Sequence, residues 1–143
     1  MKNRKIALLF SLILLILMAM LTGSCSVQTE NPVGVVTNVN AQESFDLIQE
    51  NVNNPDFIII DVRTPEEYND GHIENAINID YRSSSFESDI SKLDRDKVCL
   101  VYCRSGNRSS DAVEIMRKLG FQEIYHLDVG ITGWKEDGFT VIK

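Results

Sequence analysis

The chain is predicted to form an α/β domain in which a central, mainly parallel β-sheet is flanked by helices on both faces. Short apolar runs alternate along the sequence with segments whose apolar residues recur at helical spacing. One of these runs, Phe57–Ile60, contains only apolar residues and is typical of a strand buried on both faces of a parallel sheet. The strongest run, Val98–Tyr102, leads directly into a glycine-containing loop and a further amphipathic segment.

The first half of the domain is predicted from two helix-start signals. Asn40 lies three residues before Glu43, and Thr64 lies directly before Pro65 and three residues before Glu67. Each pair can form a reciprocal cap at the start of a helix, and proline suits the first helical position. The elements expected here are strands at 35–39, 57–60 and 76–79, helices at 41–52 and 65–70, and a third helix that starts at Ser85.

The second half is predicted to repeat the alternation. Strand 98–102 is followed by a loop and by a helix that ends at Gly120, with Ala112, Val113 and Met116 facing inward. A strand at 124–127, a short helix at 131–136 and a terminal strand at 139–142 complete the expected order.

Length and charge narrow the functional classes. The 143 residues correspond to one domain. The net charge of −7 argues against a nucleic-acid partner, because an acidic surface repels phosphates. The charge is unevenly distributed. Residues 1–24 contain no acidic residue, whereas the remaining 119 residues carry 11 basic and 21 acidic side chains, a net charge of −10.

The acid-free start has the layout of a secretory signal. Lys2, Arg4 and Lys5 precede an apolar run over residues 6–21, and small residues follow. The segment that ends at Cys25, Leu-Thr-Gly-Ser-Cys, resembles the lipobox of prokaryotic lipoproteins, although threonine stands where an aliphatic residue is usual. A signal peptide with an incidental cysteine and an uncleaved anchor are the alternatives.

The domain boundaries follow from this layout. We expect a signal peptide at 1–24, a polar tether at 25–37 that begins with a lipidated Cys25, and the folded domain at 38–143. The protein is therefore expected to be exported and held at the membrane by its N-terminus.

The loop after strand 98–102 points to a reactive thiol. Cys103 stands where backbone N–H groups of the loop and of the next helix converge, and Gly106 lets the loop curl. Arg104 and Arg108 add positive charge, which favours a thiolate over a thiol. Cys99, in the middle of the strand, is interpreted as a buried structural residue, and four extended residues separate it too far from Cys103 for a disulfide.

Four motifs in order resemble the rhodanese-like sulfurtransferase family in its single-domain form. They are Asp61–Tyr68 (DVRTPEEY), Gly71–Ile79 (GHIENAINI), Val101–Ser109 (VYCRSGNRS) and Gly130–Trp134 (GITGW), and together they cover about residues 38–143. Two positions depart from the usual pattern: Val129 replaces a glycine, and Glu74-Asn75 replaces Pro-Gly.

The resemblance implies a rhodanese fold and a persulfide formed on Cys103. The thiolate would take sulfur from a small anionic donor such as thiosulfate and pass it to a thiol or to cyanide, with no cofactor. The residues implied to bind the donor and the persulfide are Arg104, Ser105, Gly106, Asn107, Arg108 and Ser109. Asp61, Arg63 and His72 are expected to support the site structurally.

Two other functions remain open at this point. Some rhodanese-like domains act as binding or regulatory modules, and a cysteine-dependent phosphatase or arsenate reductase also uses a thiolate loop. Phosphotyrosine-type loops place an arginine after five intervening residues, where this chain has Ser109. No metal site is predicted, because His72 and His126 have no cysteine or histidine at ligand spacing, and His126 has no evident partner.

Overall fold

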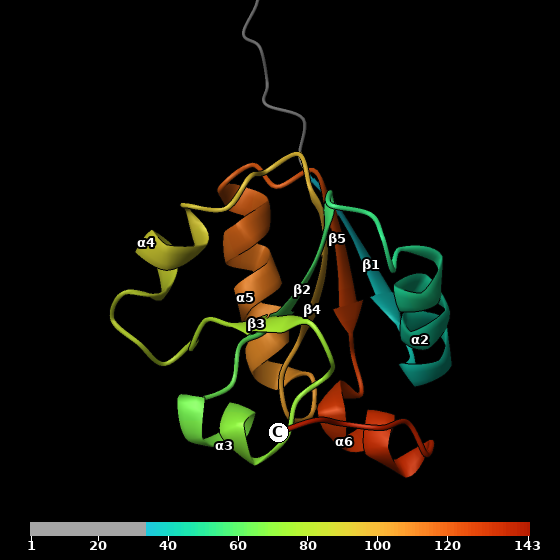
Figure 1. Ribbon diagram of the computed structural model, residues 1–143. Helices are drawn as coiled ribbons and strands as arrows, with labels where there is room; N and C mark the ends of the chain where they lie inside the picture. Colours follow the sequence, from blue (N-terminus) through green and yellow to red (C-terminus); the bar gives the residue numbers. More distant parts are fainter. Residues whose placement is uncertain (1–33) are drawn as a thin grey trace, which may run out of the picture. The chain divides into compact units, whose positions relative to one another are not determined.

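The computed structural model describes residues 34–143, which form a three-layer α/β domain (Figure 1). Its five strands are β1 (Val35–Val39), β2 (Phe57–Asp61), β3 (Ala76–Asn78), β4 (Val98–Tyr102) and β5 (Glu123–Leu127). Its helices are α2 (Ala41–Glu50), α3 (Pro65–Asp70), α4 (Phe86–Ile90), α5 (Asn107–Lys118) and α6 (Gly130–Glu136). The predicted alternation of strands and helices is confirmed.

All strand pairs of the sheet are parallel, and the strand order is β1-β5-β4-β2-β3. The first and last strands of the described chain are neighbours in the sheet, because Val35–Val39 pairs with Glu123–Leu127, and β1 and β3 are the two edge strands. β4 lies in the centre, between β5 and β2, and its last four residues are buried. Its position explains why its sequence is apolar on both faces.

Helices cover both faces of the sheet, as predicted. Cys99 and Val101 of β4 face one core, in which they pack with residues of α4 and α5. Leu100 and Tyr102 face the other core, in which they pack with residues of α2 and α6. The strand arrowheads in Figure 1 point to the end of the sheet where α3 and α6 lie, so the carboxyl ends of the strands are at that end.

The two predicted capping boxes are both present. Asn40 Oδ1 accepts from the backbone N–H of Glu43, whose carboxylate accepts from the N–H of Asn40 in return. Thr64 and Glu67 make the same exchange at α3. Each cap satisfies backbone donors that a helix start leaves free, so the two helices begin where local chemistry dictates.

The prediction of a terminal strand at 139–142 is wrong. The segment contributes one antiparallel bridge, in which His72 and Ile142 exchange two backbone hydrogen bonds of 2.9 Å. The segment is not part of the five-stranded sheet. Phe139 stacks on Phe45 with ring centroids 4.8 Å apart, and the carbonyl of Thr140 accepts from the Trp134 indole.

The N-terminal predictions lie outside the described residues. The signal peptide, Cys25 and most of the tether fall within residues 1–33. Among residues 34–143, no helix is both long and apolar enough to span a membrane.

Candidate active site around Cys103

Cys103 is the first residue after the central strand, and a four-residue turn connects that strand to α5. The turn depends on Gly106, whose φ of +89° is unfavourable for residues with a side chain. A Cβ on Gly106 would lie 2.0 Å from the carbonyl oxygen of Asp128, so space as well as conformation requires glycine. The turn brings the start of a twelve-residue helix to the Cys103 sulfur.

The Cys103 sulfur is buried and surrounded by donors. Its residue is 1% exposed, and the Ser109 hydroxyl donates to Sγ over 3.3 Å. Backbone N–H groups of Ser109, Ser105 and Gly106 also donate to it. Burial alone would raise the pKa of the Cys103 thiol, but these hydrogen bonds outweigh burial and bring the pKa below the ordinary value. The site therefore favours a thiolate.

The backbone of α6 holds the loop in this orientation from behind. The N–H of Ile131 donates to the Cys103 carbonyl over 2.9 Å, and the N–H of Thr132 donates to the Arg104 carbonyl over 3.0 Å. Gly130 has φ +59°, and a Cβ there would lie 2.5 Å from the Arg104 carbonyl carbon. Because the loop carbonyls bond to α6, the loop N–H groups are free to face the sulfur.

A cavity of about 480 Å³ opens over Cys103. The arginines on its wall are Arg82, Arg104 and Arg108, and the other lining residues are Thr64, Glu67, Cys103, Ser105 and Asn107. Arg82 and Arg104 are exposed and make no ion pair within residues 34–143, so they can meet an anionic ligand. Sequence reasoning missed Arg82 because it lies in no motif and 21 residues before Cys103.

Arg108 is engaged by a carboxylate, which the sequence did not reveal. Both Nη atoms of Arg108 donate to Glu67, over 2.7 and 2.8 Å. This hydrogen-bonded pairing lowers the pKa of Glu67 to about 2. Glu67 thus caps α3 and also neutralises Arg108, so the positive charge of Arg108 contributes less to the cavity than its sequence position suggested.

The residues expected to support the site form a buried framework next to it. The Arg63 guanidinium donates to Asp61 over 2.6 Å and to the Gly71 carbonyl over 2.7 Å. His72 stacks on Tyr68 with ring centroids 3.8 Å apart, and its Nδ1 lies 3.1 Å from the Tyr68 carbonyl. None of Asp61, Arg63 and His72 contacts the Cys103 sulfur. Their contacts connect the end of β2 to the segment after α3.

His126, which the sequence left without a partner, lies directly behind the reactive cysteine. Its Nε2 is 2.8 Å from Ser109 Oγ and 3.2 Å from the Gly106 carbonyl oxygen. Its Nδ1 is 3.0 Å from Asn38 Oδ1. One sequence signal could have identified it: Ile124 and His126 are two residues apart on β5 and so share a face, which places a polar residue beside a buried apolar one.

The two departures from the family pattern are accommodated by the backbone. Val129 has φ −83°, which suits a β-branched residue, so the turn before α6 is not strained by it. Asn75 has φ +63° and is the one non-glycine residue with positive φ among residues 34–143. Asparagine adopts this left-handed conformation more readily than other side chains, so it serves where many relatives have glycine.

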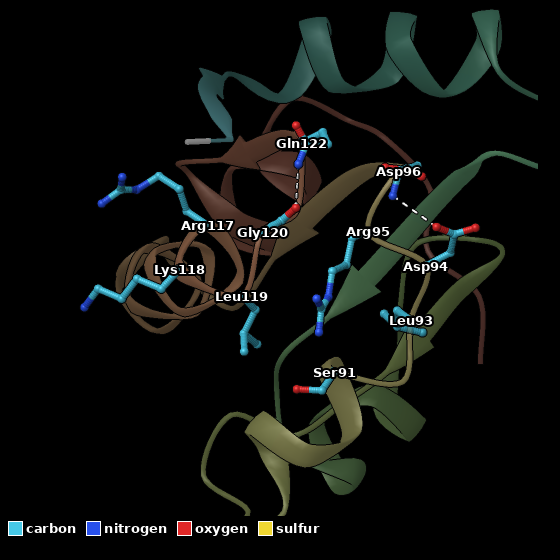
Figure 2. A pocket seen from close by; sticks show the side chains of 10 residues that line it. All are labelled: Ser91, Leu93, Asp94, Arg95, Asp96, Arg117, Lys118, Leu119, Gly120 and Gln122. Atoms are coloured by element: carbon cyan, nitrogen blue, oxygen red, sulfur yellow. Dashed lines mark hydrogen bonds between the residues drawn. The ribbon is translucent and has the colours of Figure 1, made fainter. Parts of the chain in front are cut away.

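A second hollow, of about 660 Å³, lies away from the cysteine (Figure 2). It brings together none of the predicted site residues. Arg95, Arg117 and Lys118 line it, together with Asp94 and Asp96. Within residues 34–143, no three His, Cys, Asp or Glu side chains gather closely enough to hold a metal ion.

A buried cysteine whose surroundings favour the thiolate, at the carboxyl end of a parallel sheet, is typical of the class of proteins that use a cysteine nucleophile. The comparisons with known proteins specify the family. Residues 44–137 match the model described as the rhodanese-like domain, which covers well over half of the chain. The chain therefore belongs to the rhodanese-like domain family.

Related proteins and solved structures agree with this assignment. A sulfurtransferase of Allochromatium vinosum is 29% identical over 104 residues, which are 73% of this chain and 95% of that protein. The probable adenylyltransferase/sulfurtransferase MoeZ of Mycobacterium tuberculosis is 36% identical over 76 residues, or 53% of this chain. The match covers only 19% of MoeZ.

Among solved structures, the rhodanese-related protein of Thermoplasma volcanium is 36% identical, with a TM-score of 0.62. The similarity covers 74% of this chain and 97% of that one. The rhodanese-like fold predicted from the four motifs is thereby confirmed, and the family includes proteins named as sulfurtransferases.

Proposed function

We propose that this protein is a sulfurtransferase that carries sulfur as a persulfide on Cys103. The proposal is supported above all by the surroundings of the Cys103 sulfur, which accepts hydrogen bonds from three backbone N–H groups and one hydroxyl. The donors lower the pKa of the thiol and can also stabilise the anion of a persulfide. Cys103 lies on the wall of the cavity that carries Arg82 and Arg104.

The first half of the reaction uses an anionic donor of the thiosulfate class. The Cys103 thiolate attacks the outer sulfur, a bond forms between the two sulfur atoms, and the bond to the sulfite group breaks. Sulfite leaves with the electron pair of that bond. Arg82 and Arg104 hold the donor's negative charge, because their guanidinium groups are the unpaired cations of the cavity.

The second half regenerates the enzyme. A thiolate or cyanide attacks the outer sulfur of the persulfide, and the bond between the two sulfur atoms breaks. Cys103 leaves as a thiolate, which the hydrogen-bond donors around its sulfur stabilise. The protein alternates between two covalent states, so ping-pong kinetics are expected. The S–S bond of the donor supplies the oxidation level of the persulfide and the acceptor restores the thiolate, so the cycle requires no separate oxidant or reductant and no cofactor.

The phosphatase alternative is less compatible with the cavity. A cysteine phosphatase of the phosphotyrosine type holds the phosphoryl oxygens with the arginine at the end of its cysteine loop, whose guanidinium must be free to do so. Both Nη atoms of Arg108 are already bonded to Glu67, and the loop after Cys103 is one residue too short to place this arginine at the usual spacing. We therefore favour sulfur transfer.

The experiment is a thiosulfate–cyanide assay together with the intact mass of the protein after thiosulfate treatment. The wild-type protein should gain the mass of one sulfur atom, which cyanide removes, and Cys103→Ser should gain none. Cys99→Ala is the matched control, because burial raises the pKa of Cys99 to about 12 and keeps it unreactive. Equal rates for wild type and Cys103→Ser would refute the proposal. Turnover without sulfur on Cys103 would do the same.

We also propose that the protein is exported and anchored through Cys25. This rests on the sequence pattern alone: the cationic start, the apolar run at 6–21 and the cysteine that follows it. Metabolic labelling with a radioactive fatty acid should mark the wild-type protein and not Cys25→Ala. Labelling of both, or of neither, would contradict lipidation at this residue.

A further inference from the structure

Three polar side chains form a hydrogen-bonded chain that leads from the buried reactive sulfur to Asn38, which is exposed. Ser109 of α5 bonds to Cys103, His126 of β5 bonds to Ser109, and Asn38 of β1 bonds to His126. His126 is 6% exposed and Ser109 is fully buried. The three residues come from three separate elements, so the sheet topology is what brings them together behind Cys103.

The Ser109 hydroxyl has one proton and three possible acceptors. They are Cys103 Sγ at 3.3 Å, the Gly106 carbonyl at 2.9 Å and His126 Nε2 at 2.8 Å. Asn38 Oδ1 can only accept, so it places a proton on His126 Nδ1. In the neutral ring Nε2 can then accept from Ser109, so it competes with the Cys103 sulfur for the hydroxyl proton.

Protonation of Nε2 reverses this hydrogen bond. The imidazolium donates to Ser109 Oγ and to the Gly106 carbonyl, both of which lie within reach. Nε2 then no longer accepts the Ser109 proton, and the Gly106 carbonyl already accepts from the imidazolium, so the balance shifts toward donation from Ser109 to the Cys103 sulfur. The charge state of His126 therefore decides whether Ser109 supports the thiolate.

We propose that His126 is a positioning residue that receives the Cys103 proton through Ser109. The S–H bond of Cys103 breaks and its proton passes to Ser109 Oγ, while the former hydroxyl proton of Ser109 passes to Nε2. The products are a Cys103 thiolate, an intact Ser109 hydroxyl and an imidazolium at His126. No proton leaves the protein in this step, and the net charge of the buried group is unchanged.

The surroundings of His126 suit a proton acceptor. Burial lowers the pKa of His126, and the Gly106 carbonyl and the Asp128 carboxylate oppose that effect. The ring is therefore mainly neutral at pH 7 and has a site for the incoming proton. β1 presents the uncharged Asn38, β4 presents Val101 in register with His126, and α5 presents Ser109. Asp128 is therefore the ionisable group that acts directly on the ring, and Cys103 is connected to it through Ser109.

The inference rests on the proposed function for its catalytic use, but its test does not involve sulfur transfer. Alkylation of Cys103 by iodoacetamide is followed by mass from pH 5 to pH 9 in the purified protein. His126→Gln keeps a hydrogen-bonding side chain that cannot take a proton. The midpoint of the alkylation profile should rise by about one pH unit, so alkylation below the midpoint should slow about tenfold.

The matched control is His72→Gln, which replaces the other buried histidine of the chain. It should leave the alkylation midpoint in place. A double-mutant comparison then locates the coupling: in a Ser109→Ala background, His126→Gln should have no further effect, because the connection is already broken. Additive effects of the two substitutions would overturn the proposal.

A reciprocal measurement excludes a merely structural role. Two coupled groups must shift each other's pKa equally, so Cys103→Ser should lower the pKa of His126 by as much as His126→Gln raises that of Cys103. The imidazole NMR signals report this titration in the folded protein. An unchanged His126 titration would overturn the relay even if persulfide formation succeeds, and failure of persulfide formation alone would refute only the proposed function.

Discussion

Glu67→Gln should destabilise the protein at pH 7 and much less in acid. Glu67 accepts from both Nη atoms of Arg108 and from the backbone of Thr64, and these contacts lower its pKa from 4.5 to about 2. The difference between the two pKa values corresponds to a contribution of at most about 3 kcal/mol to the free energy of unfolding, at 1.36 kcal/mol per pKa unit. Because the Glu67 side chain is 30% exposed, solvent screening reduces the expected loss to about 1–2 kcal/mol.

The pH dependence has a definite sign. The folded pKa of Glu67 lies below the unfolded one, so the contribution is complete above pH 4.5 and is lost as the pH falls toward 2. At pH 3 less than half of it should remain. Urea unfolding of wild type and Glu67→Gln at pH 7 and pH 3 measures both values.

The neighbouring carboxylate provides the control. Glu66 lies in the same first turn of α3 but is exposed and makes no ion pair within the described residues. Glu66→Gln should change the free energy of unfolding by less than about 0.5 kcal/mol at either pH. If Glu67→Gln costs the same at pH 7 and pH 3, the ion pair with Arg108 is not the source of the stability.

The remaining predictions concern the backbone and the buried ion pair. Gly106→Ala should cost about 2–4 kcal/mol and slow the alkylation of Cys103, because its Cβ would collide with Asp128; normal stability in urea would refute this. Arg63→Ala should cost about 3–5 kcal/mol, since it leaves the Asp61 carboxylate buried without its cation, and a loss below 1 kcal/mol would contradict that account. Asn75→Ala should lower the free energy of unfolding by about 1 kcal/mol, whereas Asn75→Gly should change it by less than about 0.5 kcal/mol. If thermal unfolding shows the alanine variant to be more stable than the glycine variant, left-handed strain at this position is ruled out.

The features predicted well from the sequence are those with short-range causes. The capping boxes at Asn40 and Thr64 operate over three residues, so they are visible in the sequence and are present in the structure. The buried run at Phe57–Ile60 and the loop after β4 were predicted for the same reason. The polar surroundings of the Cys103 sulfur could be anticipated because the donors come mainly from the six residues that follow it, whereas its catalytic role stays a prediction.

The features that were missed depend on contacts between distant segments. Glu67 and Arg108 are 41 residues apart, and His126 and Asn38 are 88 residues apart. No local pattern connects such pairs until the strand order is known. The terminal strand failed for a related reason: Phe139 packs among aromatic rings on α2 and α6, which outweighs the extended propensity of its segment.

The bonds from α6 to the back of the Cys103 loop have a consequence for the order in which the protein is made. Synthesis proceeds from the N-terminus, so the cysteine is complete long before Ile131 and Thr132 exist to hold its loop. β1 must likewise wait for β5, its only partner in the described sheet. A nascent chain therefore carries an unprotected thiol until α6 has emerged, and a chain cut before Gly130 retains Cys103 without the groups that orient it.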